Sequence, residues 1–181
     1  MATRRPDTIP DMTTTGRAMP PLQADERTTL ESWLDFYRAT LVMKCCGLAD
    51  EQLRTTSVPP SPLTLLGLVQ HMAEVERNWF RRVLLGEQIA PIYDPHANPS
   101  GHDGGFDLAD GVTLDTARAT WEDEVAHART NCATRTLDET SPFMGSEVTL
   151  RWIYNHMIAE YARHTGHADL IRERIDGATG V

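Results

Sequence analysis

The segment HMIAEYARHTGHADLIRE, residues 156–173, has the spacing of a core-forming helix but carries imidazole and carboxylate groups among its apolar positions. At about 100° per residue, one face of this helix collects Ile153, Met157, Ile171 and Ile175. Glu160 and His164 fall in the middle of that face and lie one turn apart. Because burying a carboxylate without a partner is costly, Glu160 needs a cation beside it.

A divalent metal ion is the cation that best suits this pair. Imidazole nitrogen and carboxylate oxygen are standard zinc ligands, and two residues at i and i+4 of a helix can bind one ion. A third ligand must come from another helix, and His71 is the only histidine of the segment LVQHMAEVERNWF, residues 68–80. On the helical wheel His71 lies on the flank of its apolar face, so a hydrogen-bonded core histidine is the alternative. We take His71, Glu160 and His164 as the candidate metal ligands.

Four segments have helical spacing, and no segment predicts a strand. The helices are expected over about residues 25–46, 61–86, 113–135 and 149–175. They predict an all-α protein, a four-helix bundle. The connection over residues 86–112 is crowded with Pro, Gly, Asp and Asn, and it could carry the chain along the bundle as a long crossover. Connections of this length often contact substrate, with a mere surface excursion as the alternative.

Capping residues set the expected helix ends. Asp25 can cap the first helix, and Gly47 can close it. Ser61 followed by Pro62 predicts the start of the second helix. Thr113 is the expected cap of the third helix.

Composition narrows the class of protein. The chain has 181 residues and 40% hydrophobic residues, which predicts one globular domain. Its net charge of −9 argues against nucleic acid as the main partner, because phosphate binding needs a basic face. No apolar run approaches the roughly 20 residues of a membrane span, and the N-terminus has no signal-peptide core. We therefore expect a cytoplasmic protein with a disordered arm over residues 1–23 and a bundle domain over residues 24–181.

Three cysteines without a paired pattern predict no disulfide framework. Cys45 and Cys46 are adjacent, and Cys132 is far from both in the sequence. We expect Cys45 to be a buried small residue near a helix end, with thiol chemistry as the alternative.

Several other polar residues lie near the helix faces. His167, one turn beyond His164, is the candidate general base, with an outer metal ligand and a substrate contact as alternatives. His156 is interpreted as part of the scaffold. Glu76 is expected to pair with an arginine such as Arg163 or Arg172. The remaining histidines lie in loop or solvated contexts and are not assigned a role: His96, His102 and His127.

Two segments, SPLTLLGLVQHMAEVERNWFRRVLLGE and TLRWIYNHMIAEYARHTGHADLIRERIDG, resemble the DinB-like superfamily of metal-binding four-helix bundles, also called YfiT-like. The DUF664 group is the nearer branch. Many DinB-like proteins use three histidines, but Glu160 stands where the first histidine of the last helix is expected. The metal-binding domain of mycothiol-dependent maleylpyruvate isomerase is similar in using a histidine followed by E-x3-H. The resemblance thus implies that His71, Glu160 and His164 hold a divalent metal.

The same resemblance implies a class of function. Zinc is the first candidate for the metal, with nickel and iron as alternatives. The implied activity is a thiol S-transferase that joins mycothiol, or a similar low-molecular-weight thiol, to a small electrophile. Isomerase activity is not implied, because that isomerase uses an additional domain. The alternatives are a metal-dependent hydrolase of the same fold and a non-catalytic metal-binding bundle. A homodimer is the expected assembly.

Overall fold

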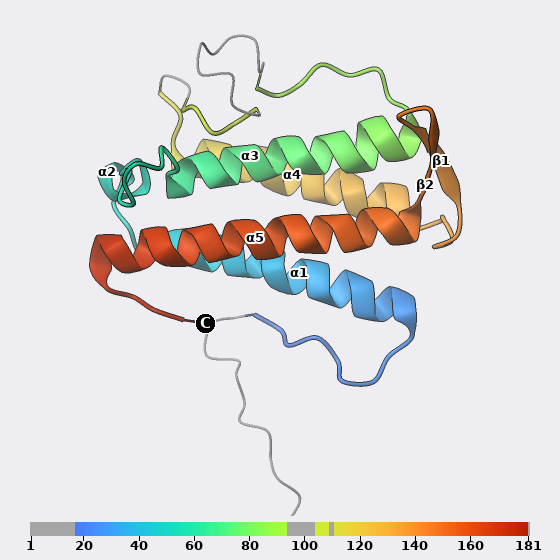
Figure 1. Cartoon of the computed structure of the whole chain (residues 1–181), viewed down its shortest axis with the longest axis horizontal. Helices are drawn as coiled ribbons and strands as arrows, with labels where there is room; N and C mark the ends of the chain where they lie inside the picture. Colours follow the sequence, from blue (N-terminus) through green and yellow to red (C-terminus); the bar gives the residue numbers. More distant parts are fainter. Residues whose placement is uncertain (1–16, 94–103, 109–110, 181) are drawn as a thin grey trace, which may run out of the picture.

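The structure, a computed structural model, describes residues 17–93, 104–108 and 111–180. Four main helices form the predicted bundle (Figure 1). They are α1 (Glu26–Cys45), α3 (Leu65–Arg77) with its continuation η1 (Asn78–Val83), α4 (Leu114–Cys132) and α5 (Leu150–Asp176). A short helix, α2 (Asp50–Leu53), lies in the link between α1 and α3.

The bundle is made of two helix pairs. In Figure 1, α5 lies beside α1, and α3 lies beside α4; these are also the most extensive contacts between helices. The apolar faces of all four helices meet between the pairs. The largest fully buried side chains there include Leu34, Leu41, Phe80, Ile153, Met157 and Tyr161.

The second helix starts later than its sequence signals predict. Thr64 is its cap, and the Thr64 hydroxyl oxygen accepts a hydrogen bond from the Gly67 backbone nitrogen at 3.0 Å. The helix therefore begins at Leu65 and not at Pro62. Ser61 uses its hydroxyl within the preceding turn instead. Ser and Thr cap helices by the same bond, so the sequence alone cannot decide between nearby hydroxyl residues.

The end of this helix widens into η1, a π-helical segment that the sequence spacing does not predict. A π-helical turn takes up an extra residue and is frequent at functional sites, because it turns side chains away from the regular helical face. Here it carries Asn78, Trp79 and Arg82, and all three line the cleft described below.

A short hairpin corrects the prediction that the chain has no strands. β1 (Thr140–Phe143) pairs antiparallel with β2 (Ser146–Thr149). Met144 and Gly145 connect them with φ angles of 48° and 78°, as a tight two-residue hairpin turn requires. Each strand has four residues and buries only one of them, so the apolar alternation that reveals a strand is missing.

Parts of the connection between η1 and α4 lie on α3. A Cβ atom at Gly67 would approach the Phe106 carbonyl oxygen to 2.7 Å, so only glycine allows this contact.

Near the N-terminus, Arg17 is buried and donates a hydrogen bond to Thr40 on α1 at 2.7 Å. None of the described helices is both long enough and apolar enough to cross a membrane.

Candidate metal centre

Three potential metal ligands converge between α3 and α5. His71 comes from α3, and Glu160 and His164 come from α5. Ligand atoms of the three side chains all lie within 4.8 Å of one another. Nε2 of His164 lies 3.4 Å from a carboxylate oxygen of Glu160. Both histidines are buried, whereas 17% of the Glu160 side chain remains exposed.

The connection between η1 and α4 orients the His71 ring. Its Nδ1 lies 3.1 Å from the Gly104 carbonyl oxygen; because a carbonyl only accepts, Nδ1 carries the proton and the lone pair is on Nε2. The Phe106 ring stacks on the imidazole, with centroids 3.9 Å apart. Gly105, which lies between Gly104 and Phe106 in the sequence, has a φ of 99°. A Cβ atom there would lie 2.6 Å from the His71 backbone nitrogen.

These three residues, Gly104 to Phe106, were missed by the sequence analysis. Two adjacent glycines followed by an aromatic residue, inside an unusually long connection, were the signal that could have pointed to them.

His164 is held in the neutral form that binds metals. Burial, together with the neighbouring imidazoles of His71 and His167, lowers the pKa of His164 from 6.5 to about 3. Its Nδ1 lies 3.4 Å from Nδ1 of His167, while its Nε2 faces Glu160. A hydrogen bond of this kind to the far side of an imidazole is how outer groups orient metal-binding histidines. His167 thus touches a potential ligand but is not among the described residues that line the adjacent cleft.

The three side chains fit a divalent ion in geometry and in chemistry. Two ligands of a tetrahedral zinc ion lie about 3.3 Å apart, because the bonds to zinc are about 2.0–2.1 Å long. The distance between His164 and Glu160 already matches this value. His71, the third potential ligand, has a ligand atom within 4.8 Å of those of the other two residues. Three protein ligands also leave a coordination position for a substrate.

A cleft of about 490 Å³ opens beside these residues. His156 was interpreted as scaffold, yet it lies in the cleft wall with its Nε2 3.8 Å from Glu160. Burial lowers the pKa of His156 below its usual value. The connection over residues 86–112, where a substrate contact was one of the two alternatives, supplies further lining residues: Pro91, Tyr93, Gly104 and Phe106.

Two arginines reach the same cleft. Arg82 donates to Glu74 and to the Ile89 carbonyl oxygen, both at 3.0 Å. Arg163 lies 3.4 Å from Glu160. Among the described charged residues of the cleft, the two arginines therefore balance the two glutamates. A bound divalent ion would make this surface net positive, which suits an anionic sulfur ligand.

Glu76 pairs with an arginine, as predicted, but the partner is Arg38 and neither Arg163 nor Arg172. Glu76 is fully buried and accepts two hydrogen bonds from Arg38 on α1, at 2.9 and 2.8 Å. The Tyr161 hydroxyl donates to the same carboxylate at 2.6 Å. Arg38 reaches Glu76 on α3 from α1. The sequence pattern of one helix cannot show which residue of another helix faces it.

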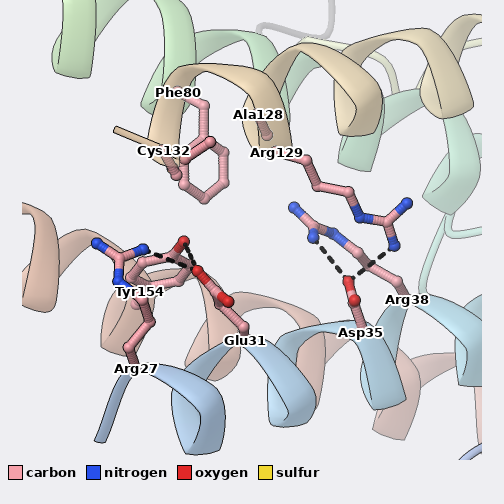
Figure 2. A pocket seen from close by; sticks show the side chains of 10 residues that line it. Arg27, Glu31, Asp35, Arg38, Phe80, Ala128, Arg129, Cys132 and Tyr154 are labelled. Atoms are coloured by element: carbon pink, nitrogen blue, oxygen red, sulfur yellow. Dashed lines mark hydrogen bonds and ion pairs between the residues drawn. The ribbon is translucent and has the colours of Figure 1, made fainter. Parts of the chain in front are cut away.

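A second cavity, of about 320 Å³, lies between α1, α4 and α5 (Figure 2). Its charged side chains pair with one another: Arg38 and Arg129 with Asp35, and Arg27 with Glu31. We take the cleft beside the three potential ligands as the functional site, because all three of them line it.

The other histidines do not add to the described site. His127 is exposed on α4 and lies 3.7 Å from Asp123. The expectations for His96 and His102 concern residues outside the described part of the chain.

The chain matches a known protein family. Residues 29–177 match the family described as "Mycothiol-S-transferase", which is a DinB/YfiT-like family. The match includes all three potential ligands and nearly all of the four main helices. No curated protein matches the chain.

Proposed function

Because the chain belongs to the mycothiol-S-transferase family, we propose that it is a metal-dependent enzyme that joins the thiol of mycothiol to a small electrophile. The observation that carries this proposal is the convergence of His71, Glu160 and His164 beside an open cleft. The closer likeness to the DUF664 branch, which rests on the two segments quoted above, and the likeness to the isomerase domain, which rests on His71, Glu160 and His164, stay predictions. The domain limits of 24–181 and the homodimer stay predictions.

We assign the role of metal ligands to His71, Glu160 and His164, with zinc as the ion and nickel or iron as alternatives that accept the same donors. A bound divalent ion lowers the pKa of a coordinated thiol, so that the thiolate is available as a nucleophile near neutral pH. Glu160 with two neutral imidazoles leaves a single formal positive charge on such an ion, which one thiolate neutralises.

The protein's own groups orient the ligands and shape the cleft. Gly104 and Phe106 hold the His71 ring, and His167 supports His164 from behind. In the transfer, a sulfur–carbon bond forms at the electrophile as a second bond of that carbon breaks, to a leaving group, an epoxide oxygen or the neighbouring carbon of an activated double bond. The atom released takes the electron pair of the broken bond, and the thiol gives up its proton. His167 stays the predicted proton acceptor. His156 lines the cleft and is within reach of a molecule in it, whereas His167 is not among the described lining residues.

Metal content and thiol transfer together test this function. Purified protein should contain near-stoichiometric metal, and Glu160→Ala and His164→Ala should each lose most of it. His127→Ala removes an exposed histidine far from the cleft and should keep the metal. Unchanged metal in the Glu160 and His164 variants would reject the assigned ligands.

The activity assay uses mycothiol and a panel of small electrophiles. Conjugates should form faster with the metal-loaded enzyme than without it, and the two ligand variants should lose most of the acceleration. Turnover of the electrophile by water, with no dependence on thiol, would instead favour the hydrolase.

A further inference from the structure

An aromatic surface extends from the metal centre toward the hairpin end of the bundle. We call it the aromatic wall, and it consists of Trp79, Phe143, Trp152 and His156. The Trp152 and His156 rings are stacked, with centroids 5.0 Å apart and planes 7° apart. Trp79 contacts both His156, at 4.3 Å, and Phe143, at 5.2 Å. Three separate elements therefore build one continuous surface.

The wall joins two hollows. Trp79 and His156 line the cleft that contains the potential metal ligands. Phe143 and Trp152 line an adjoining hollow of about 410 Å³ on the hairpin. Trp152 is 47% exposed although it belongs to an aromatic cluster. An exposed indole that continues a cleft is typical of a binding surface, because its ring offers a large apolar area to a ligand.

The position of the wall limits what can occupy it. Glu160, His156 and Trp152 follow one another at intervals of one helical turn on α5. Each residue rises about 1.5 Å, so Trp152, eight residues before Glu160, lies about 12 Å along the helix from it. The electrophile must meet the sulfur beside Glu160. The far end of the wall is therefore within reach of a long co-substrate and out of reach of a small electrophile.

Polar groups border the aromatic rings. Asn78 and Arg163 lie in the cleft, and Ser146 and Thr149 border the hollow on the hairpin. Flat aromatic faces surrounded by hydrogen-bonding groups suit a sugar ring, which presents C–H bonds on its face and hydroxyl groups on its rim. An extended apolar ligand would leave these polar groups without partners.

We propose that the aromatic wall binds the sugar portion of the thiol co-substrate, while its sulfur lies at His71, Glu160 and His164. Mycothiol is a cysteine derivative that carries an aminosugar and an inositol ring, so its two ends match the two parts of this surface. This assignment rests on the proposed function, and it makes Trp152 and Trp79 determinants of thiol specificity.

The test compares two thiols on the metal-loaded enzyme: mycothiol and N-acetylcysteine, which has the same reactive end without the rings. Trp152→Ala should raise the KM for mycothiol about tenfold, leave kcat nearly unchanged, and leave the KM for N-acetylcysteine unaffected. Trp33→Ala is the matched control, because Trp33 is a 38% exposed tryptophan on α1 outside the wall. It should change neither KM.

Equilibrium binding separates this proposal from the proposed function. By calorimetry, the wild-type protein should bind mycothiol more tightly than N-acetylcysteine, and Trp152→Ala should remove the difference. Equal affinity of the wild type for both thiols overturns the aromatic wall as a sugar site. So does a Trp152→Ala variant in which only the KM for the electrophile rises. Preferential mycothiol binding without any conjugation would keep the wall and reject the transferase function.

Discussion

At the scale of single residues, Glu160 and His71 differ in how well the sequence predicts their place in the candidate site. Glu160 was predicted on an apolar helix face, where a carboxylate needs a cation, and its spacing from His164 pointed to a metal. In the structure it is partly exposed at the cleft, beside both His164 and Arg163. His71 lay on the flank of its helix, and its direction depends on a backbone carbonyl from another part of the chain. Helical periodicity contains no information about such a contact. The loop residues around Gly105 therefore fix the orientation of the His71 ring, which helical periodicity does not determine.

Gly105→Ala should weaken metal binding about tenfold or more, since outer groups that orient a ligand typically change affinity about 10–100-fold. The added Cβ would lie 2.6 Å from the His71 backbone nitrogen, so the loop must move and take the Gly104 carbonyl with it. Competition with a chromophoric chelator measures the affinity. Gly111→Ala is the control, because Gly111 also has a positive φ but open space around its Cβ position. Equal affinity in the two variants would contradict the role of the loop.

The cysteines of the protein give a second residue-scale prediction. Burial raises the pKa of Cys45 to about 12 and that of Cys132 to about 11, whereas Cys46 is exposed. A brief treatment of the folded protein with iodoacetamide should therefore modify Cys46 alone, as mass spectrometry of its peptides can show. Cys46→Ser should retain thiol transfer, because the nucleophile is the co-substrate. Loss of transfer in this variant would point to a thiol of the protein instead.

At the scale of elements, regular helices could be predicted and irregular segments could not. Asp25 and Thr113 cap α1 and α4 as expected, since each cap bond is local in the sequence. The hairpin was missed because its pairing, and not its apolar pattern, defines it. The π-helical segment η1 was missed because its sequence reads as an ordinary helix. The same is true of the candidate site. Its potential ligands lie on regular helices and could be predicted, whereas its orienting and lining groups lie largely on irregular segments.

The two helices that carry the ligands are also joined by a buried hydrogen bond. Tyr161, which follows Glu160 on α5, donates to Glu76 on α3 at 2.6 Å and accepts from Trp121 on α4 at 2.7 Å. We expect Tyr161→Phe to weaken metal binding by up to about tenfold, because α5 loses a fixed position relative to His71. The same chelator competition measures this change.

A second tyrosine provides the matched control for this variant. Tyr154 on α5 donates to Glu31 on α1, so Tyr154→Phe also removes a hydroxyl bond but not one between α3 and α5. Tyr161→Phe should lose about 1–3 kcal/mol of stability, because the buried Trp121 nitrogen loses its acceptor. Tyr154→Phe should lose less stability, because Glu31 keeps Arg27 as a partner. Only Tyr161→Phe should lose metal affinity. An equal loss in both would mean that general loosening of the bundle, and not the Glu76 contact, is responsible.

At the scale of the whole molecule, the ligands join the two helix pairs. His71 belongs to the pair formed by α3 and α4, and Glu160 and His164 belong to the pair formed by α1 and α5. The contacts of α5 with α1 and of α3 with α4 are more extensive than those between α3 and α5. A metal ion bound by all three residues would therefore strengthen the contact between α3 and α5, which is less extensive than the contacts within each helix pair. Metal binding should then contribute to stability as well as to chemistry.

Removal of the metal should lower the melting temperature by about 5–10 °C when the free metal had been about a hundredfold above its Kd. The reason is mass action: an ion that binds only the folded protein stabilises it by an amount set by that ratio, and here the ion holds α3 against α5. Thermal unfolding with and without a chelator, followed by readdition of zinc, nickel or iron, measures the effect and ranks the metals. Glu160→Gln keeps the side-chain size but removes the carboxylate ligand, so the chelator should change its melting temperature very little. An equal drop in the wild type and in Glu160→Gln would show that the chelator acts elsewhere, and that the two helix pairs are held together without the ion.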